Sequence, residues 1–247
     1  MSMSMGMAVP RSVWMWVLVV GAFALGAWAQ SAGLIADILW RWEDIVFLAR
    51  QHMQLVAISG GLAILVGVPL GILLSRPAMR RMAETLMQGL NVGTTIPTLA
   101  VLALSMTFLG IGTVPAIFAL WIASLLPIVR NTYIGILEVP AALREAAQGM
   151  GMTNLQMLWR VELPNALWVI FAGIRTALAI NVGTVPLAFL IGGGGLGELI
   201  FTGIALAETG MMLAGAIPTA ILAVLTDFLV ATVARFTVPR GVNPLAR

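Results

Sequence analysis

The most constraining feature of this chain is a series of apolar runs, each close to or beyond the length that crosses a lipid bilayer. An α-helix rises about 1.5 Å per residue, so a hydrocarbon core about 30 Å thick needs about 20 apolar residues. The runs lie at residues 13–29, 53–74, 84–109, 114–137, 166–191 and 211–234. Backbone polar groups inside lipid must bond within their own segment, which a helix achieves. The runs therefore predict an all-α, polytopic membrane protein with six transmembrane helices.

The spacing of the runs leaves no room for a separate soluble domain. Hydrophobic residues make up 60% of the 247 residues and charged residues only 9%. We predict a short cytoplasmic tail at residues 1–12 and a single transmembrane domain at residues 13–247. The first run has an alternative interpretation as the apolar part of a signal peptide, because residues 27–29, Ala-Trp-Ala, weakly match a cleavage site. Its length favours a retained span.

The arginines indicate which side of the membrane each connection faces. All 13 basic residues are arginine, and the net charge is +3. With the N-terminus inside, nine arginines are cytoplasmic: Arg11, Arg76, Arg80, Arg81, Arg144, Arg160, Arg235, Arg240 and Arg247. Arg41 and Arg50 are then outside, and Arg130 and Arg175 lie within spans. Because positive charge accumulates on cytoplasmic segments, both termini are predicted to be cytoplasmic, and the charge does not indicate a nucleic-acid partner.

The most polar stretch between two spans is residues 141–164, which the arginines place in the cytoplasm. Its first ten residues are rich in good helix formers, and Gly151 can end that helix with a positive φ. Thr153 or Asn154 can cap a second short helix that ends at Glu162. We expect two short helices joined by an elbow, followed by a proline that marks the start of the next span.

Within this stretch, Glu-Ala-Ala at 145–147 is followed by Gly151 and by Val-Glu-Leu-Pro at 161–164. Small alanines would let a partner surface approach closely, and a glutamate could anchor to it. The spacing resembles the EAA loop of ABC-importer permeases, which has Glu-Ala-Ala, three residues, Gly, nine residues and Ile-x-Leu-Pro. The resemblance implies coupling to an ATPase through Glu145, Ala146, Ala147, Gly151, Val161, Leu163 and Pro164. An ordinary helical loop without a partner is the alternative.

Two longer regions resemble the glycine betaine/carnitine/choline permeases, an osmoprotectant family of ABC importers. One runs from Thr-Ile-Pro-Thr-Leu-Ala at residues 95–100 to Leu-Pro-Ile-Val-Arg-Asn-Thr-Tyr at residues 126–133, and the other covers residues 189–204. The resemblance implies a five-helix ABC type I importer core preceded by one N-terminal helix. It also implies uptake of glycine betaine, carnitine or choline by alternating access across the bacterial cytoplasmic (inner) membrane.

The resemblance further implies a set of partners around the chain. They are the lipid bilayer, a cytoplasmic ABC ATPase that holds ATP and Mg, an extracytoplasmic substrate-binding protein, and a second permease subunit, either the same chain or a paralogue. The chain has no lysine and so cannot contain a Walker A sequence; we expect no cofactor in it and no enzymatic activity. The alternatives are a permease of an ABC importer for another small solute, such as an amino acid, and a secondary transporter.

No metal or dinucleotide site is predicted. The chain has no cysteine and one histidine, His52, so cysteine and multi-histidine ligand sets are excluded. His52 is expected to be an interfacial residue without special function. Residues 192–197, Gly-Gly-Gly-Gly-Leu-Gly, formally match G-x-G-x-x-G but lack the preceding strand of a βαβ unit. They are expected to form a turn or a backbone that re-enters the membrane edge.

A recurrence of Asn-Val-Gly-Thr, followed shortly by Pro, occurs within the third and fifth predicted spans. Proline frees a backbone carbonyl that needs a partner or a watery cavity in a membrane, and paired Gly/Pro-interrupted segments point to a transport path. The candidate path residues are Asn91, Thr94, Thr95, Pro97, Asn181, Thr184 and Pro186. The alternative is that these residues serve helix packing.

Charged side chains within spans form a further candidate cluster. Arg130, Arg175 and Asp227 all fall near the predicted cytoplasmic ends of their spans, where snorkelling lowers the cost of burying charge. We predict that Asp227 pairs with Arg175 or Arg130 and fixes the cytoplasmic mouth.

Overall fold

The computed structural model describes residues 20, 30, 33–93, 95–239 and 241–242. Every regular element in these residues is helical, and no strand occurs among them. The all-helical prediction is therefore confirmed for the described part of the chain. The tail at 1–12, nearly all of the first predicted span at 13–29, and Thr94 lie outside the described residues.

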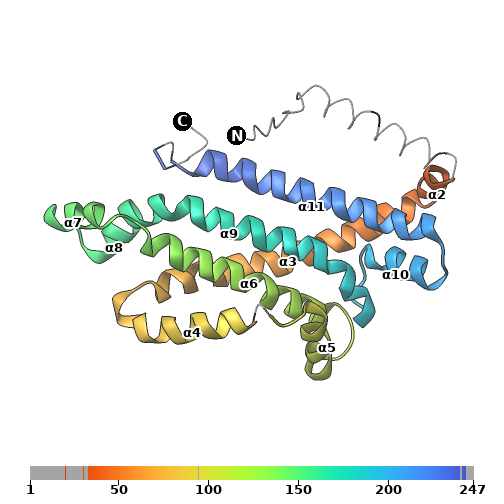
Figure 1. Cartoon of the computed structure of the whole chain (residues 1–247), viewed down its shortest axis with the longest axis horizontal. Helices are drawn as coiled ribbons and strands as arrows, with labels where there is room; N and C mark the ends of the chain where they lie inside the picture. Colours follow the sequence, from red (N-terminus) through yellow and green to blue (C-terminus); the bar gives the residue numbers. More distant parts are fainter. Residues whose placement is uncertain (1–19, 21–29, 31–32, 94, 240, 243–247) are drawn as a thin grey trace, which may run out of the picture.

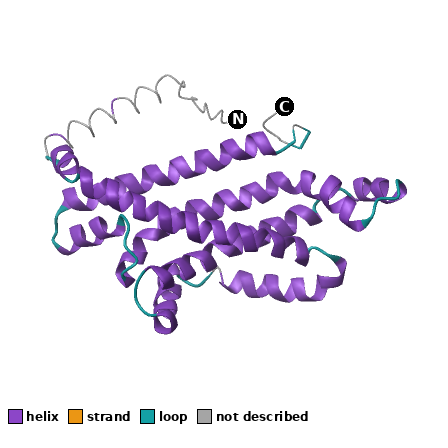
Figure 2. Cartoon of the chain, turned by 180° about the vertical axis from the view of Figure 1, so that it is seen from behind, coloured by secondary structure: helices purple, strands orange, loops and turns teal. Residues whose placement is uncertain are grey.

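Long helices run side by side along the longest axis of the molecule (Figures 1 and 2). They are α3 (Trp42–Leu74), α6 (Thr113–Leu137), α9 (Leu163–Thr184) and α11 (Thr209–Thr237). Helix α6 packs between α3 and α9, and α11 packs on the other side of α9. Four helical segments of the described chain are long and apolar enough to cross a membrane, or up to five if a bent pair counts as one span.

The third predicted span, residues 84–109, is not one continuous helix. It consists of α4 (Arg80–Gly93) and α5 (Thr98–Leu109), which follow a short 3₁₀ turn η1 (Pro77–Met79) and are bent by 102° relative to each other. Pro97 stands directly before α5 with φ −58° and ψ 135°. An extended proline that lacks an N–H cannot continue the preceding helix, which is the physical reason for the break.

The second predicted span begins earlier than its apolar run suggested. Helix α2 (Leu34–Trp40) and α3 are separated only at Arg41, so α3 starts at Trp42 rather than at residue 53. His52 therefore lies inside a helix that packs on α6 and α9, where it is fully buried. The expectation of an interfacial His52 is wrong, because its neighbours come from a segment about 130 positions further along the chain.

The fifth predicted span ends in a tight turn. Helix α9 is followed by the 3₁₀ helix η3 (Val185–Ile191), a glycine-rich loop, and α10 (Gly197–Ala205), which packs against η3 and α11. The core around this turn is apolar: Leu102 of α5, Leu120 of α6 and Val182 of α9 are fully buried in one cluster. The glycine run thus forms the predicted turn between two packed elements.

Candidate functional site

The stretch 141–164 projects beyond the ends of the long helices, where α7 and α8 lie together (Figure 1). It consists of α7 (Ala141–Gly149), α8 (Asn154–Met157) and the π-helical segment η2 (Leu158–Glu162). Of the candidate coupling residues on α7, Glu145 and Ala146 are exposed, whereas Ala147 is fully buried. One face of α7 is thus open to a partner, and Ala147 holds the opposite face against the chain.

The elbow after α7 forms as its sequence predicts. Gly151 has φ +74°. The N–H of Gly151 donates to the carbonyl of Gln148 (2.9 Å), and the N–H of Met152 donates to the carbonyl of Ala147 (3.1 Å). This pair of bonds is the Schellman motif, which satisfies the last carbonyls of a helix and needs a left-handed residue at this position.

The second arm of the loop begins at Thr153, one of the two predicted caps. The N–H of Gln156 donates to the Thr153 hydroxyl oxygen, and the Thr153 N–H donates to the Gln156 side chain, forming a capping box. The predicted end at Glu162 is wrong, because α8, η2 and α9 follow one another without a break. Pro164 is accommodated in the first turn of α9, where its missing N–H is tolerated next to the π-helical segment.

Sequence reasoning missed that the loop exposes large apolar side chains. The loop lies outside the packed helices, and several of its exposed side chains are large and apolar: Leu143, Met150, Leu155 and Trp159. The sequence pattern alone could not identify them, because single exposed apolar residues are common on proteins. A group of them draws attention only when the structure shows that they share one projecting loop. Each of α7, the elbow, α8 and η2 therefore carries one exposed apolar side chain, and Glu145 is exposed on α7 as well.

Sequence reasoning also missed a buried charge cluster at the root of the loop. The carboxylate of Glu162 lies 2.8 Å from Nη2 of Arg76 and 3.1 Å from Nε of Arg144, and its side chain is only 5% exposed. The N–H directions at these contacts lie outside hydrogen-bond geometry, so they are electrostatic contacts. A signal was available: Glu162 stands two residues before Pro164, on the side where both arginines were predicted.

The candidate path residues are not brought together on one surface. Asn91, Thr95 and Pro97 are exposed on or next to α4 and α5, whereas Asn181 and Pro186 are buried. The Asn181 amide donates to the hydroxyl oxygens of Ser59 on α3 (2.9 Å) and Ser124 on α6 (2.7 Å). For Asn181 this geometry favours the packing alternative, because its amide joins three helices.

Replacement of Asn181 by Leu is expected to lower the free energy of unfolding by about 1–2 kcal/mol, because it removes two interhelical hydrogen bonds and leaves an oversized side chain. Denaturant titration of the protein in detergent measures this. The control is Thr176→Val, since exposed Thr176 donates to the carbonyl of Ala172 in its own helix; its effect should stay within about 0.5 kcal/mol. Unchanged stability with lost uptake for Asn181→Leu would restore the path interpretation.

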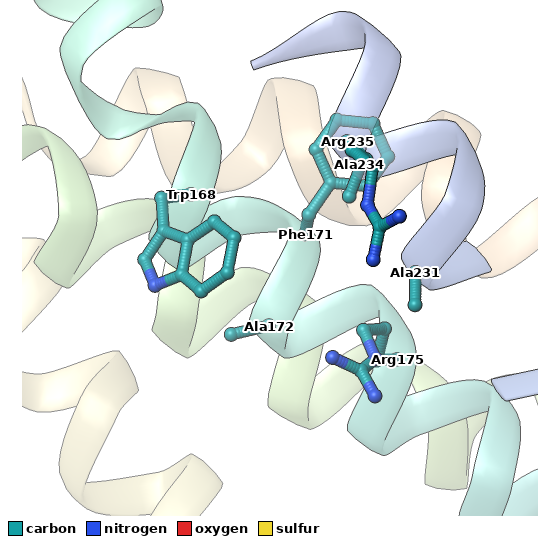
Figure 3. Close-up of a pocket in the computed structure, with 7 residues that line it drawn as sticks. All are labelled: Trp168, Phe171, Ala172, Arg175, Ala231, Ala234 and Arg235. Atoms are coloured by element: carbon teal, nitrogen blue, oxygen red, sulfur yellow. The ribbon is translucent and has the colours of Figure 1, made fainter. Parts of the chain in front are cut away.

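Asp227 contacts Arg175, one of its two predicted partners. Nε and Nη2 of Arg175 donate to the two carboxylate oxygens of Asp227 at 2.9 and 2.7 Å. Arg130 is exposed and makes no ion pair within the described part of the chain. Figure 3 shows Arg175 of α9 and Arg235 of α11 bordering a small pocket together with Trp168 and Phe171. The pair thus joins α9 to α11 beside an aromatic pocket.

At the opposite end of α9, the glycine-rich loop is fastened to α3. The N–H of Gly195 donates to the side-chain oxygen of Gln51 (3.2 Å). Nε2 of His52 lies 3.0 Å from the carbonyl of Val182 in the last turns of α9. Together these contacts hold the turn against the first half of α3.

Residues 67–238 match the family described as binding-protein-dependent transport system inner membrane component. The chain is 55% identical over 202 residues to the osmoprotectant import permease protein OsmY of Salmonella typhimurium, covering 82% of this chain and 86% of that one. It is 41% identical over 200 residues to the glycine betaine/carnitine/choline transport system permease protein OpuCB of Bacillus subtilis, covering 81% and 91%.

A solved structure has the same fold. It is an inward-facing conformation of the MetNI methionine ABC transporter, with a TM-score of 0.71 and 25% identity, covering 79% of this chain and 96% of the matched chain. The family match spans the loop at 141–164 and three of the four long helices in full. The chain therefore belongs to the binding-protein-dependent transport system inner membrane components, as an osmoprotectant-type permease subunit of an ABC importer rather than an enzyme.

Proposed function

We propose that this permease carries an osmoprotectant of the glycine betaine, carnitine or choline class into the cell by alternating access. The observation that carries the proposal is the projecting α7, with Glu145 and Ala146 exposed and a rigid elbow at Gly151. A projecting helix with an exposed face of this kind is suited to binding a partner that moves it. The choice of solute rests on the names of the relatives in Salmonella typhimurium and Bacillus subtilis.

The partner at α7 is a cytoplasmic ABC ATPase, which supplies ATP and Mg to the assembly. Glu145 is the anchor, Ala146 permits close approach, and the exposed apolar side chains Leu143 and Met150 contribute contact area. Gly151, Val161, Leu163 and Pro164 shape the loop rather than touch the partner. A second permease subunit and an extracytoplasmic substrate-binding protein complete the importer.

The permease has six spans in the bacterial inner membrane, with both termini in the cytoplasm and residues 13–247 as one domain. Support comes from the arginines at the two ends of the bundle. Arg76 follows the end of α3 and Arg235 lies in the last turn of α11, and both helix ends are on the side of the bundle that carries α7 (Figure 1). Arg41 directly precedes α3 and pairs with Glu208. This asymmetry agrees with a cytoplasmic α7.

Reversal of the charge at Glu145 tests the docking role. In a membrane extract, Glu145→Arg is expected to reduce the ATPase that co-purifies with the permease about tenfold, because an anchoring contact becomes a repulsive or unpaired charge. Glu208→Arg is the matched control at the far end of the bundle and should retain the ATPase. Equal retention by both variants would remove Glu145 from the docking surface.

A second candidate solute is an amino acid, since the fold is shared with a methionine transporter at TM-score 0.71. Competition binding to the cognate substrate-binding protein separates the two. Displacement of a quaternary ammonium probe by glycine betaine, and not by methionine, is the expected result.

A further inference from the structure

We propose that Arg76, Glu162 and Arg144 form a force-transmitting tie, which passes movement of α7 to the membrane helices. The proposal rests on the proposed docking of an ATPase at α7 and deepens it. It assigns three positioning residues that act between the docking surface and the spans.

Helix α7 has few other attachments to the body of the chain. It packs mainly against α8 and η2, its own neighbours in sequence. Arg144 is the side chain that reaches further: its Nη2 donates to the carbonyl of Ile136 in the last turn of α6, while its Nε faces Glu162. Through one guanidinium, α7 therefore contacts both the end of α6 and the last residue of η2, directly before α9.

Arg76 fixes the other side of Glu162 to α3. Its Nε donates to the carbonyl of Ile72 (3.2 Å), and its Nη2 donates to the hydroxyl oxygen of Ser75 (2.9 Å). Ser75 in turn donates to the Ile72 carbonyl (2.7 Å). A cation bonded to the last carbonyls of a helix is also favoured by the helix dipole. Arg76 is thus locked to the end of α3.

Glu162 is the joint between these two anchors. It is buried at the end of η2, directly before α9, and its carboxylate contacts both guanidinium groups. The end of α3 and the segment directly before α9 therefore meet α7 at one carboxylate, and the end of α6 joins them through the Arg144 guanidinium. When α7 moves, the tie obliges these three helix ends to move with it instead of letting the loop bend at its elbow.

The chemistry of the cluster suits transmission better than stability. A buried ion pair recovers its desolvation cost only in part, so apolar side chains of similar volume would stabilise the fold at least as well. What the charges add is a strong mutual attraction in a buried place, which keeps the three side chains together when one of them moves. The π-helical segment that carries Glu162 also points to a functional role, since π-helical turns are rare and are frequently found at functional sites.

The test uses the complete importer, with its ATPase and binding protein, reconstituted in liposomes. For Glu162→Gln, we expect the ATPase content to be unchanged and the solute imported per ATP hydrolysed to fall about tenfold, the size of a typical coupling energy. Glu162→Asp, which keeps the charge, should recover most of the loss. Glu208→Gln is the matched control at the exposed pair with Arg41 and should leave the ratio unchanged.

The outcomes separate the tie from the docking proposal. An unchanged ratio of solute to ATP in Glu162→Gln would overturn the tie. Loss of the ATPase from that variant alone would overturn it too, because Glu162 would then be needed for the ATPase to dock. If Glu162→Gln fails to insert, Arg144→Lys replaces it: lysine keeps the charge but cannot reach both Ile136 and Glu162, so the ratio should still fall. An unsubstituted permease that holds no ATPase would instead defeat the proposed function.

Discussion

Substitution of Gly197 by Ala is expected to abolish the native packing of the glycine-rich loop. A Cβ at this position would lie 2.0 Å from the carbonyl oxygen of Pro186 and 2.7 Å from its carbonyl carbon. Both are backbone atoms of η3, which is held between α5, α6 and α10, so neither can rotate away as a side chain would. We expect a loss of about 3 kcal/mol or more in the free energy of unfolding.

The matched control for Gly197→Ala is Gly89→Ala. Gly89 lies on the exposed face of α4, and a Cβ there would meet nothing within 4 Å. Alanine in a helix is favoured over glycine, so the control should be neutral or more stable by up to about 1 kcal/mol. Thermal unfolding of both variants in detergent measures the difference. Equal midpoints for the two would mean that η3 and α10 separate more easily than their contact indicates.

The consequence of Gly197→Ala should extend to transport. The loop joins α9 to α10 and is tied to α3 through Gln51 and Gly195. A displaced loop would release the end of α9 that lies opposite α7. Uptake should therefore be lost in Gly197→Ala even at temperatures where the protein remains in the membrane, whereas Gly89→Ala should transport normally.

Local features of this chain were predictable because their causes are local. The elbow at Gly151 and the cap at Thr153 depend on residues within a few positions, and both form in the structure. The apolar runs at α6 and α11 were located within a few residues for the same reason, since a bilayer-length run needs no knowledge of its neighbours.

Features that depend on distant partners were not predictable in the same way. His52 looked like an interfacial residue until Val182 and Gly195 were placed against it. Glu162 looked like a helix end, because its partner Arg76 lies 86 positions earlier in the chain. The break before Pro97 had a local cause, but a proline inside an apolar run is compatible with either a kinked span or two helices.

The pairing of Arg175 with Asp227 was the exception, a long-range contact that the sequence suggested. Charges within spans are costly, so each one restricts the others: a lone aspartate near two arginines must pair, snorkel or be protonated. Chemistry alone named two possible partners, and packing of α9 against α11 decided between them. Scarcity of charge is what made a contact across 52 positions predictable.

A double-mutant cycle on this pair is therefore expected to give a large coupling energy. Asp227→Leu alone leaves the Arg175 guanidinium without its carboxylate, at a cost of up to about 2.5–3.5 kcal/mol that snorkelling reduces. Arg175→Leu alone strands the carboxylate of Asp227. The double Leu variant removes both charges, and because leucine suits lipid, it should be more stable than either single variant. Denaturant titration in detergent should give a coupling energy above about 1 kcal/mol.

Arg130 supplies the control cycle, since it is exposed and makes no salt bridge with another residue that the structure describes. Arg130→Leu should add to Asp227→Leu within about 0.5 kcal/mol. Additivity in the Arg175 cycle, or coupling to Arg130 of the same size, would mean that the bidentate contact does not persist in the membrane. The direction of coupling shows what the pair does: if each charge compensates the other, stability should fall when either side chain is replaced and recover in part when both are replaced.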